Sequence, residues 1–319
     1  MRALLPLSMT VQSSATLTEA PALYPSRAGL LWGLLGVAAF SFTVPFTRAA
    51  TADGGLSPLF TGAGRAVVAA LLAAAALAIT RQRLPGGAQW ARLAIVAGGV
   101  VVGFPLLTSY ALTSASAGHG AVVIALLPAA TAVLAVLRGR ERPPRSFWVT
   151  AAAGAVAAVA FALSQGSGGG VHGSDLLLLG AVLAAGAGYA EGGLLARELG
   201  AWQTISWALV LSAPLTIALT AVAVARHPPA ATAAEWAAFA YLAVVSMYLG
   251  FFAWYRGLAI GPMARVSQIQ LVQPVLSICW AALLLREPLS WPTAVGGLAV
   301  IACAGTAVRT RLAPAPGGR

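Results

Sequence analysis

The chain has 319 residues, of which 59% are hydrophobic and 8% are charged, and its mean hydropathy is +0.86. A water-soluble domain carries roughly 25% charged residues, so this composition excludes a soluble globular protein and indicates a helical membrane protein. All 19 basic residues are arginine. The absence of lysine excludes a P-loop ATPase, which needs the lysine of its phosphate-binding loop. It also excludes a Schiff base to retinal or pyridoxal phosphate.

Residues 1–28 predict a cytoplasmic tail and not a cleaved signal peptide, because Pro6 and Ser8 break the early apolar run. Ten apolar runs follow, and a backbone in lipid must satisfy its own hydrogen bonds, so runs of this length predict membrane-spanning helices. The predicted spans cover residues 30–49, 59–79, 93–113, 118–138, 146–164, 176–196, 203–225, 236–255, 265–285 and 290–308. Residues 309–319 predict a second cytoplasmic tail.

The arginines predict the orientation of these spans. With the N-terminus inside, fifteen arginines fall on the inner side, and Arg48, Arg65, Arg226 and Arg286 fall on the outer side. Arginine accumulates in cytoplasmic loops, so we expect an inner (plasma) membrane protein with both termini in the cytoplasm. The same rule explains the net charge of +11 without a nucleic-acid partner.

The glycine-rich segment 165–175 predicts a periplasmic linker between two sets of five spans, residues 29–164 and 176–308. Leu112, Pro128 and Glu141 recur 146 positions later as Leu258, Pro274 and Glu287. Because five is odd, the second set must be inserted upside down relative to the first. Inverted repeats are common in secondary transporters, whose substrate site lies at the repeat interface near the midplane.

Pro128 and Pro274 fall near the middle of the fourth and ninth spans. Each proline removes one helix hydrogen bond, and we expect paired kinks beside a central cavity. The alternative is that these prolines are merely tolerated, as prolines often are in membrane helices.

The fourth span with its flanks reads A-L-T-S-A-S-A-G-H-G-A-V-V-I-A-L-L-P-A-A-T-A-V-L-A-V-L-R-G-R-E-R-P, and its twin reads W-Y-R-G-L-A-I-G-P-M-A-R-V-S-Q-I-Q-L-V-Q-P-V-L-S-I-C-W-A-A-L-L-L-R-E-P-L. Both resemble the EamA-type repeat of the drug/metabolite transporter superfamily, which has an Ala-Leu pair, a mid-span proline and a Glu-Pro end. The resemblance covers residues 29–164 and 176–308. It implies an all-α protein with ten transmembrane helices, and the export of small organic solutes such as amino acids, metabolites or drugs.

Several polar residues within the predicted spans are candidates for the transport site. Glu191 lies inside the sixth span, where a carboxylate could carry a coupling proton or hold a cationic substrate; the alternative is a structural ion pair with an arginine at the inner end. Gln270 and Gln273 share a face of the ninth span with Gln268 nearby. Their amides suit a polar or zwitterionic substrate, although interhelical hydrogen bonding would explain them equally simply.

Aromatic and small residues complete the candidate list. Tyr248, Phe251, Ser41 and Phe40 lie deep enough in their spans to line a cavity. Tryptophans and tyrosines nearer the span ends predict an interfacial belt, with Trp254 and Tyr255 among them. Pairs of glycines four residues apart predict close helix packing. Glu141 and Glu287, each beside an arginine, predict interfacial ion pairs that set the geometry of the repeats.

No motif for catalysis or for a metal or cofactor is present. The chain has no H-E-x-x-H motif, no cysteine cluster and no paired carboxylate motif, so we expect no catalytic residue, no metal, no cofactor and no enzymatic activity. The expected partners are a small-molecule solute, the lipid bilayer and a coupling proton. The sequence therefore predicts a secondary transporter working by alternating access. Two alternatives stay open: a membrane-embedded enzyme acting on lipid or isoprenoid, and a channel or scaffold.

Overall fold

The structure is a computed structural model that describes residues 27–51, 54–139, 145–165, 172–260, 266 and 269–312. These residues form helices and connecting turns, with no β-strand among them. The predicted all-α fold is therefore confirmed. Most of the two predicted tails, residues 1–26 and 313–319, lies outside the described residues.

The first half of the chain contains eight α-helices and one π-helix in its described part. They are α1 (Arg27–Ser41), α2 (Thr43–Thr51), α3 (Pro58–Ile79), α4 (Gly87–Val96), η1 (Ala97–Gly103), α5 (Phe104–Ala111), α6 (Ala117–Ile124), α7 (Leu127–Gly139) and α8 (Arg145–Gln165). Several of them are consecutive pieces of one predicted span: α1 continues into α2, and α4 continues through η1 into α5.

The second half repeats this order of elements. Its described helices are α9 (Gly173–Glu198), α10 (Ala201–Arg226), α11 (Ala233–Tyr241), η2 (Leu242–Leu249), α12 (Gly250–Ile260), η3 (Gln270–Val272), α14 (Gln273–Leu284) and α15 (Trp291–Leu312). Here α11, η2 and α12 form one continuous helical segment, as α4, η1 and α5 do in the first half.

Seven described helical segments are long and apolar enough to cross a membrane. They are Ala28–Thr51, Pro58–Ile79, Gly87–Ala111, Ala117–Leu134, Gly173–Glu198, Ala201–Arg226 and Ala233–Ile260. The other three predicted spans coincide with shorter apolar stretches at Trp148–Ala157, Gln270–Leu284 and Trp291–Cys303. The structure thus supports a multi-span protein, and the count of ten spans stays a prediction.

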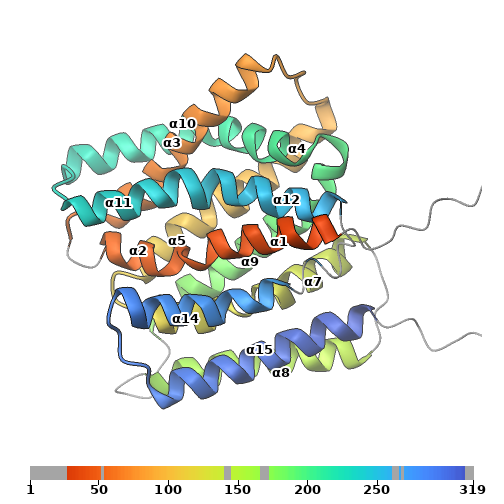
Figure 1. The fold of residues 1–319 in the computed structure, drawn as a ribbon, viewed down its shortest axis with the longest axis vertical. Helices are drawn as coiled ribbons and strands as arrows, with labels where there is room; N and C mark the ends of the chain where they lie inside the picture. The colour runs from red at the N-terminus through yellow and green to blue at the C-terminus, as the bar shows by residue number, and fades with distance from the viewer. Residues whose placement is uncertain are drawn as a thin grey trace, which may run out of the picture.

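The long helices run side by side across the molecule (Figure 1). The pairs α3–α10 and α8–α15 pack together at opposite edges of the bundle, and α1 packs on α12 between them. The start of α1 and the end of α15 lie at the same end of the bundle (Figure 1), as an even number of crossings requires.

Local backbone features recur at the spacing of 146 residues found in the sequence. Gly54 and Gly200 both have positive φ, at 77° and 98°. The backbone N–H of Gly86 donates to Gln89 Oε1 at 2.8 Å, and that of Thr232 donates to Glu235 Oε2 at 2.6 Å. The two π-helices, η1 and η2, also occupy matching positions. At these equivalent positions the two halves therefore have the same local conformation.

Glycines allow the two halves to approach closely. A Cβ on Gly99 of η1 would lie 2.4 Å from the carbonyl oxygen of Ala184 and 2.9 Å from the backbone nitrogen of Gly188, both in α9. A Cβ on Gly257 of α12 would lie 2.7 Å from the backbone nitrogen of Gly33 in α1. The G-x-x-x-G pairs thus serve helix packing within the chain, as the sequence predicted.

Large apolar side chains cover the outside of the bundle. On α10, Leu215 and Ile217 are each 52% exposed, and on α15 Leu298 is 68% exposed. A soluble protein rarely leaves so many large apolar side chains in water, whereas lipid tails solvate them. The predicted aromatic belt is wrong for Trp254 and Tyr255, which are buried between helices at 1% and 0% exposure.

Candidate functional site

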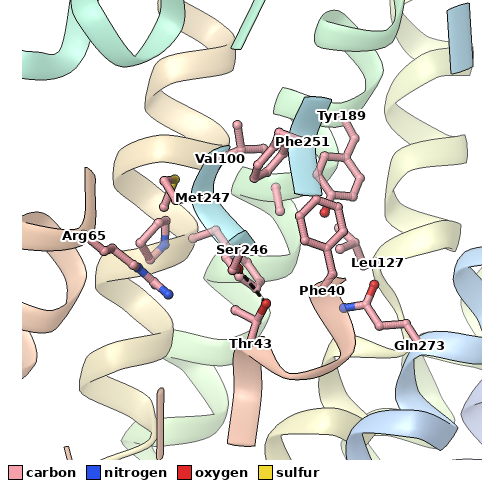
Figure 2. Close-up of a pocket in the computed structure, with 13 residues that line it drawn as sticks. Phe40, Thr43, Arg65, Val100, Leu127, Tyr189, Ser246, Met247, Phe251 and Gln273 are labelled. Carbon is pink, nitrogen blue, oxygen red and sulfur yellow. Dashed lines mark hydrogen bonds between the residues drawn. The ribbon is translucent and has the colours of Figure 1, made fainter. Parts of the chain in front are cut away.

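A central cavity lies between the two halves of the chain (Figure 2). The space outside atoms, open part included, amounts to about 400 Å³. Its lining residues are Phe40, Thr43, Arg65, Val100, Phe104, Pro105, Leu127, Ala185, Tyr189, Ser246, Met247, Phe251 and Gln273. Val100 comes from η1, and Ser246 and Met247 come from η2, so both π-helices face this space, as such irregular turns often do at functional sites.

A second, smaller cavity adjoins the first. It holds about 250 Å³, again with its open part included. Its lining residues are Val44, Ala121, Ile124, Leu127, Pro128, Gln270, Gln273, Pro274 and Ser277. Leu127 and Gln273 line both cavities, and both predicted prolines line the second one.

The helices are interrupted directly before Pro128 and Pro274. In the first half a two-residue turn at 125–126 separates α6 from α7, and in the second the 3₁₀ turn η3 precedes α14. Pro128 and Pro274 each occupy the second position of the helix that follows, where the missing N–H costs no helical hydrogen bond. Both interruptions lie beside a cavity, whereas the predicted loss of a helix hydrogen bond at each proline does not occur at these positions. The role of the two prolines in transport stays a prediction.

Three aromatic rings form one wall of the central cavity. The ring centroids of Phe40 and Phe251 are 4.8 Å apart, those of Tyr189 and Phe251 are 5.8 Å apart, and those of Phe40 and Tyr189 are 6.3 Å apart. The rings come from α1, α9 and α12, so both halves contribute. Such a wall suits an apolar or aromatic part of a ligand. Phe40 and Phe251 were predicted from the sequence; Tyr189 was not.

Polar groups gather elsewhere around the same cavity. The hydroxyl groups of Thr43 in α2 and Ser246 in η2 share a hydrogen bond of 2.7 Å. In Figure 2 the guanidinium of Arg65 and the amide of Gln273 lie on opposite sides of this hydroxyl pair. The cavity therefore combines an aromatic wall with a cation, two hydroxyls and an amide.

Arg65 is another site residue that sequence reasoning missed. It was counted with the outer arginines, but the structure places it seven residues into α3, with 1% of its surface exposed. Nη1 donates to Thr47 Oγ1 at 3.4 Å and Nη2 to Thr108 Oγ1 at 3.5 Å, whereas Nε has no hydrogen-bond partner. Its position inside an apolar run, between Gly64 and Ala66, was the available signal.

Gln270 and Gln273 are buried where the sequence predicted a substrate site. They are 3% and 6% exposed. In the described part of the chain, neither Gln273 Oε1 nor Gln270 Nε2 has a hydrogen-bond partner. Buried amides normally satisfy both groups, so these two atoms are available to a ligand. Gln268 lies outside the described residues.

Ser41 and Tyr248 line neither cavity. The hydroxyl of Ser41 donates to the carbonyl of Ala38 at 2.7 Å and accepts from Trp280 Nε1 at 2.9 Å. Tyr248 shares a hydrogen bond of 3.1 Å with Ser206. In this structure both hydroxyls bond neighbouring helices, and their predicted contact with substrate stays a prediction.

Glu191 also lies away from both cavities. It is 2% exposed and pairs with the guanidinium of Arg92 in α4, whose Nη1 also donates to Glu198 Oε1 at 2.6 Å. This ion pair joins the two halves at the end of the bundle where α9 ends. It corresponds to the structural alternative considered for Glu191.

Polar contacts also join the halves at the opposite end. The carboxylate of Glu287 accepts hydrogen bonds from the backbone N–H groups of Ala117 and Gly118, at 2.9 and 3.0 Å. His119 Nε2 lies 2.6 Å from Asp175 Oδ1. Glu287 thus caps the N-terminus of α6, where its negative charge is favourable, and the ion pair predicted for it stays a prediction. Glu141 lies outside the described residues.

The described residues contain no group of three or more His, Cys, Asp or Glu side chains that could hold a metal ion. Cys279 and Cys303 are both free thiols. The candidate site consists of the two adjoining cavities and of the polar and aromatic groups that line them.

Comparisons with known proteins follow the same division of the chain. The model of the EamA-like transporter family matches twice, at residues 27–163 and 172–308. A relative from Bacillus subtilis (strain 168), named "Uncharacterized transporter YdeK", is 44% identical over 281 residues, which cover 88% of this chain and 97% of the relative.

A solved structure titled "Crystal structure of protein" has the same fold. Its TM-score with this protein is 0.62 and its sequence identity is 18%. The match covers 90% of this chain and 98% of the chain in the solved structure. The two family matches span most of the chain, and they confirm the resemblance found in the fourth and ninth predicted spans. The protein belongs to the EamA-like transporter family.

Proposed function

We propose that this protein is a secondary transporter that exports small organic solutes, such as amino acids, metabolites or drugs, by alternating access around the central cavity. Family membership supports a transporter role. The observation that carries the proposal is the cavity lined by both halves of the chain, next to helices interrupted at Pro128 and Pro274. Discontinuous helices at the interface of two repeats are typical of substrate sites in secondary transporters.

The contacts between the halves suggest how access alternates. Arg92 pairs with Glu191 and Glu198 at one end of the bundle, and Glu287 caps α6 at the other. Each set joins the first half of the chain to the second. In an alternating cycle one set breaks while the other holds, so that the cavity opens to one side at a time. An inverted orientation of the halves would place these two sets on opposite membrane faces.

The arginine distribution supports an inner-membrane location with both termini in the cytoplasm. The lack of lysine leaves no P-loop for ATP, so a solute gradient or a proton gradient supplies the energy. Glu191 pairs with Arg92, and the alternative role, in which Glu191 carries a coupling proton, is distinguished by the pH profile of transport.

Counterflow in proteoliposomes tests the function. The purified full-length protein is reconstituted in vesicles loaded with an unlabelled mixture of amino acids and organic acids, and uptake of each labelled solute is followed by mass spectrometry. We expect at least one solute to accumulate transiently above equilibrium, which only a carrier produces. Flux without counterflow would indicate a channel, and a chemically altered solute would indicate an enzyme; either result overturns the proposal.

A further inference from the structure

The side chain of Arg65 is a buried cation that has no counter-charge among the residues that the structure describes. It lies about 10 Å along α3 from the helix start at Pro58, taking 1.5 Å per residue. Only 1% of its surface is exposed. A charged side chain within a membrane protein is costly, and such residues normally face a partner or a functional cavity.

The acidic residues of the structure are engaged elsewhere. In the described part of the chain the acidic residues are Asp175, Glu191, Glu198, Glu235 and Glu287. Each bonds to another group: a histidine, Arg92, the α11 cap or the α6 N-terminus. None of them forms an ion pair with Arg65. The other three acids, Glu19, Asp53 and Glu141, lie outside the described residues.

The hydroxyl partners of Arg65 do not replace a counter-charge. Its bonds to Thr47 and Thr108 are 3.4 and 3.5 Å long, whereas charge-assisted hydrogen bonds are typically about 2.7–2.9 Å. The Thr108 hydroxyl also donates to the carbonyl of Phe104 at 2.7 Å. With Nε unpartnered as well, the guanidinium keeps much of its capacity to bind an anion at the cavity wall.

From this arrangement we propose that Arg65 binds the carboxylate of the transported solute, and that the solute is a small monocarboxylate with an apolar or aromatic body. This inference rests on the proposed transport function. Among the described lining residues Arg65 is the single basic side chain, which matches one negative charge better than the double charge of a phosphate. The hydroxyls of Thr43 and Ser246 complete a polar region of the wall.

The cavity wall away from Arg65 indicates what the rest of the solute is. Phe40, Tyr189 and Phe251 form the aromatic wall, and Figure 2 shows these rings above the level of the Arg65 guanidinium. An apolar body packs there while the carboxylate reaches Arg65. Gln273 Oε1, which has no partner among the described residues, would accept a hydrogen bond from an N–H or O–H group of the solute.

Three probes with the same phenylpropyl body but different charges test the proposal: phenylpropionate, phenylpropionamide and phenylpropylamine. Equilibrium binding of each is measured on the full-length protein in nanodiscs. We expect the acid to bind more tightly than the amide and the amine to bind least. Equal binding of acid and amide, tighter binding of the amine, or no binding of the acid would overturn the proposal. This comparison needs no variant.

Variants of Arg65 then locate the binding group. We expect Arg65→Gln to weaken binding of the acid by about tenfold or more, the worth of a hydrogen bond between charged groups, and to change binding of the amide by less than about twofold. Arg65→Lys should restore part of the affinity, because the charge remains while the planar fork is lost. Arg226→Gln, at the exposed end of α10, is the matched control. An unchanged affinity of Arg65→Gln for the acid would contradict the inference.

Counterflow of the same probes separates this inference from the proposed function. If phenylpropionate binds in an Arg65-dependent way but shows no counterflow, the carboxylate site is supported and the transport function is contradicted. If the amide or the amine shows counterflow, and Arg65→Gln does not change it, the transport function is supported and the carboxylate site is contradicted.

Discussion

Arg92 of α4 forms an ion pair with Glu191 of α9, joining residues that are 99 positions apart in the chain. The side chain of Glu191 is 3% exposed and that of Arg92 is 21% exposed. Water therefore screens this pair much less than a surface pair. Arg92 also reaches Glu198 at 2.6 Å, but the Glu198 side chain is 45% exposed. One arginine thus links the two halves through one buried and one exposed carboxylate.

Neutralising the buried carboxylate should destabilise the protein more than neutralising the exposed one. Glu191→Gln removes the buried carboxylate that binds Arg92, and losing a hydrogen bond to a charged group costs about 1.5–3 kcal/mol. Glu198→Gln, the matched control, should cost less than about 1 kcal/mol, as exposed pairs do. Thermal unfolding in detergent measures both. The double variant Arg92→Gln/Glu191→Gln should cost less than the sum of the single changes, and additive costs would argue against a direct pair.

The pH dependence of transport separates the two roles considered for Glu191. Its carboxylate is held by Arg92 and lines neither cavity, so we expect Glu191→Gln to lower the transport rate without changing the shape of the pH profile. The measurement is counterflow in proteoliposomes from mildly acidic to mildly alkaline pH. A flattened profile would establish Glu191 as the coupling residue.

Glu287 should stabilise the end of the bundle opposite to Arg92. Its carboxylate accepts the backbone N–H groups of Ala117 and Gly118 across the two halves. Removing a helix cap typically costs about 1 kcal/mol, and we expect a loss of this size for Glu287→Ala and a smaller loss for Glu287→Gln. Thermal unfolding is the measurement. Equal stability of Glu287→Ala and the wild type would show that the cap contributes nothing.

Alanine substitutions at two adjacent glycines test the close contact of η1 with α9. A Cβ on Gly99 would meet the carbonyl oxygen of Ala184 at 2.4 Å, whereas a Cβ on Gly98 has no heavy atom within 4 Å. Gly99→Ala must push the helices apart and should cost about 1–3 kcal/mol, as overpacking does. Gly98→Ala should be neutral or slightly stabilising, since alanine is the better helix former. Similar unfolding temperatures for the two variants would contradict this packing.

Local patterns in the sequence predicted much of this architecture. The apolar runs and the prolines at positions 128 and 274 follow from the limits that lipid places on the backbone, and they coincide with helices and interruptions in the structure. Phe40, Phe251 and Gln273 were recognised because their depth in a span follows from residue counting. The π-helices left no comparable signal, because Gly98, Gly99 and Gly103 in η1 are equally compatible with an α-helix.

Contacts between distant residues could not be predicted in this way. The pairing of Glu191 with Arg92 depends on how two helices pack, and a single sequence contains no record of that. The same holds for Ser41, whose hydroxyl is bonded by Trp280 from the other half, and for Trp254, which packs against Tyr189 instead of lying at the membrane surface. Burial of Arg65 was missed for a related reason: the orientation rule counts arginines by segment and ignores their depth.

The long hydrogen bonds of Arg65 predict that this side chain lowers the stability of the ligand-free protein. Among the described residues the buried guanidinium makes two long hydrogen bonds, so we expect Arg65→Met to raise the Tm of the ligand-free protein. Replacing buried charges by apolar groups of similar volume often stabilises by about 1–4 kcal/mol. The same variant should lose binding of phenylpropionate. Arg48→Met is the matched control, since Arg48 donates to the carbonyl oxygens of Leu112 and Thr113, both at 2.8 Å. That variant leaves two carbonyls without their donor and should lower the Tm. If Arg65→Met lowers the Tm as much as Arg48→Met does, then Arg65 is a structural residue whose charge the fold already satisfies.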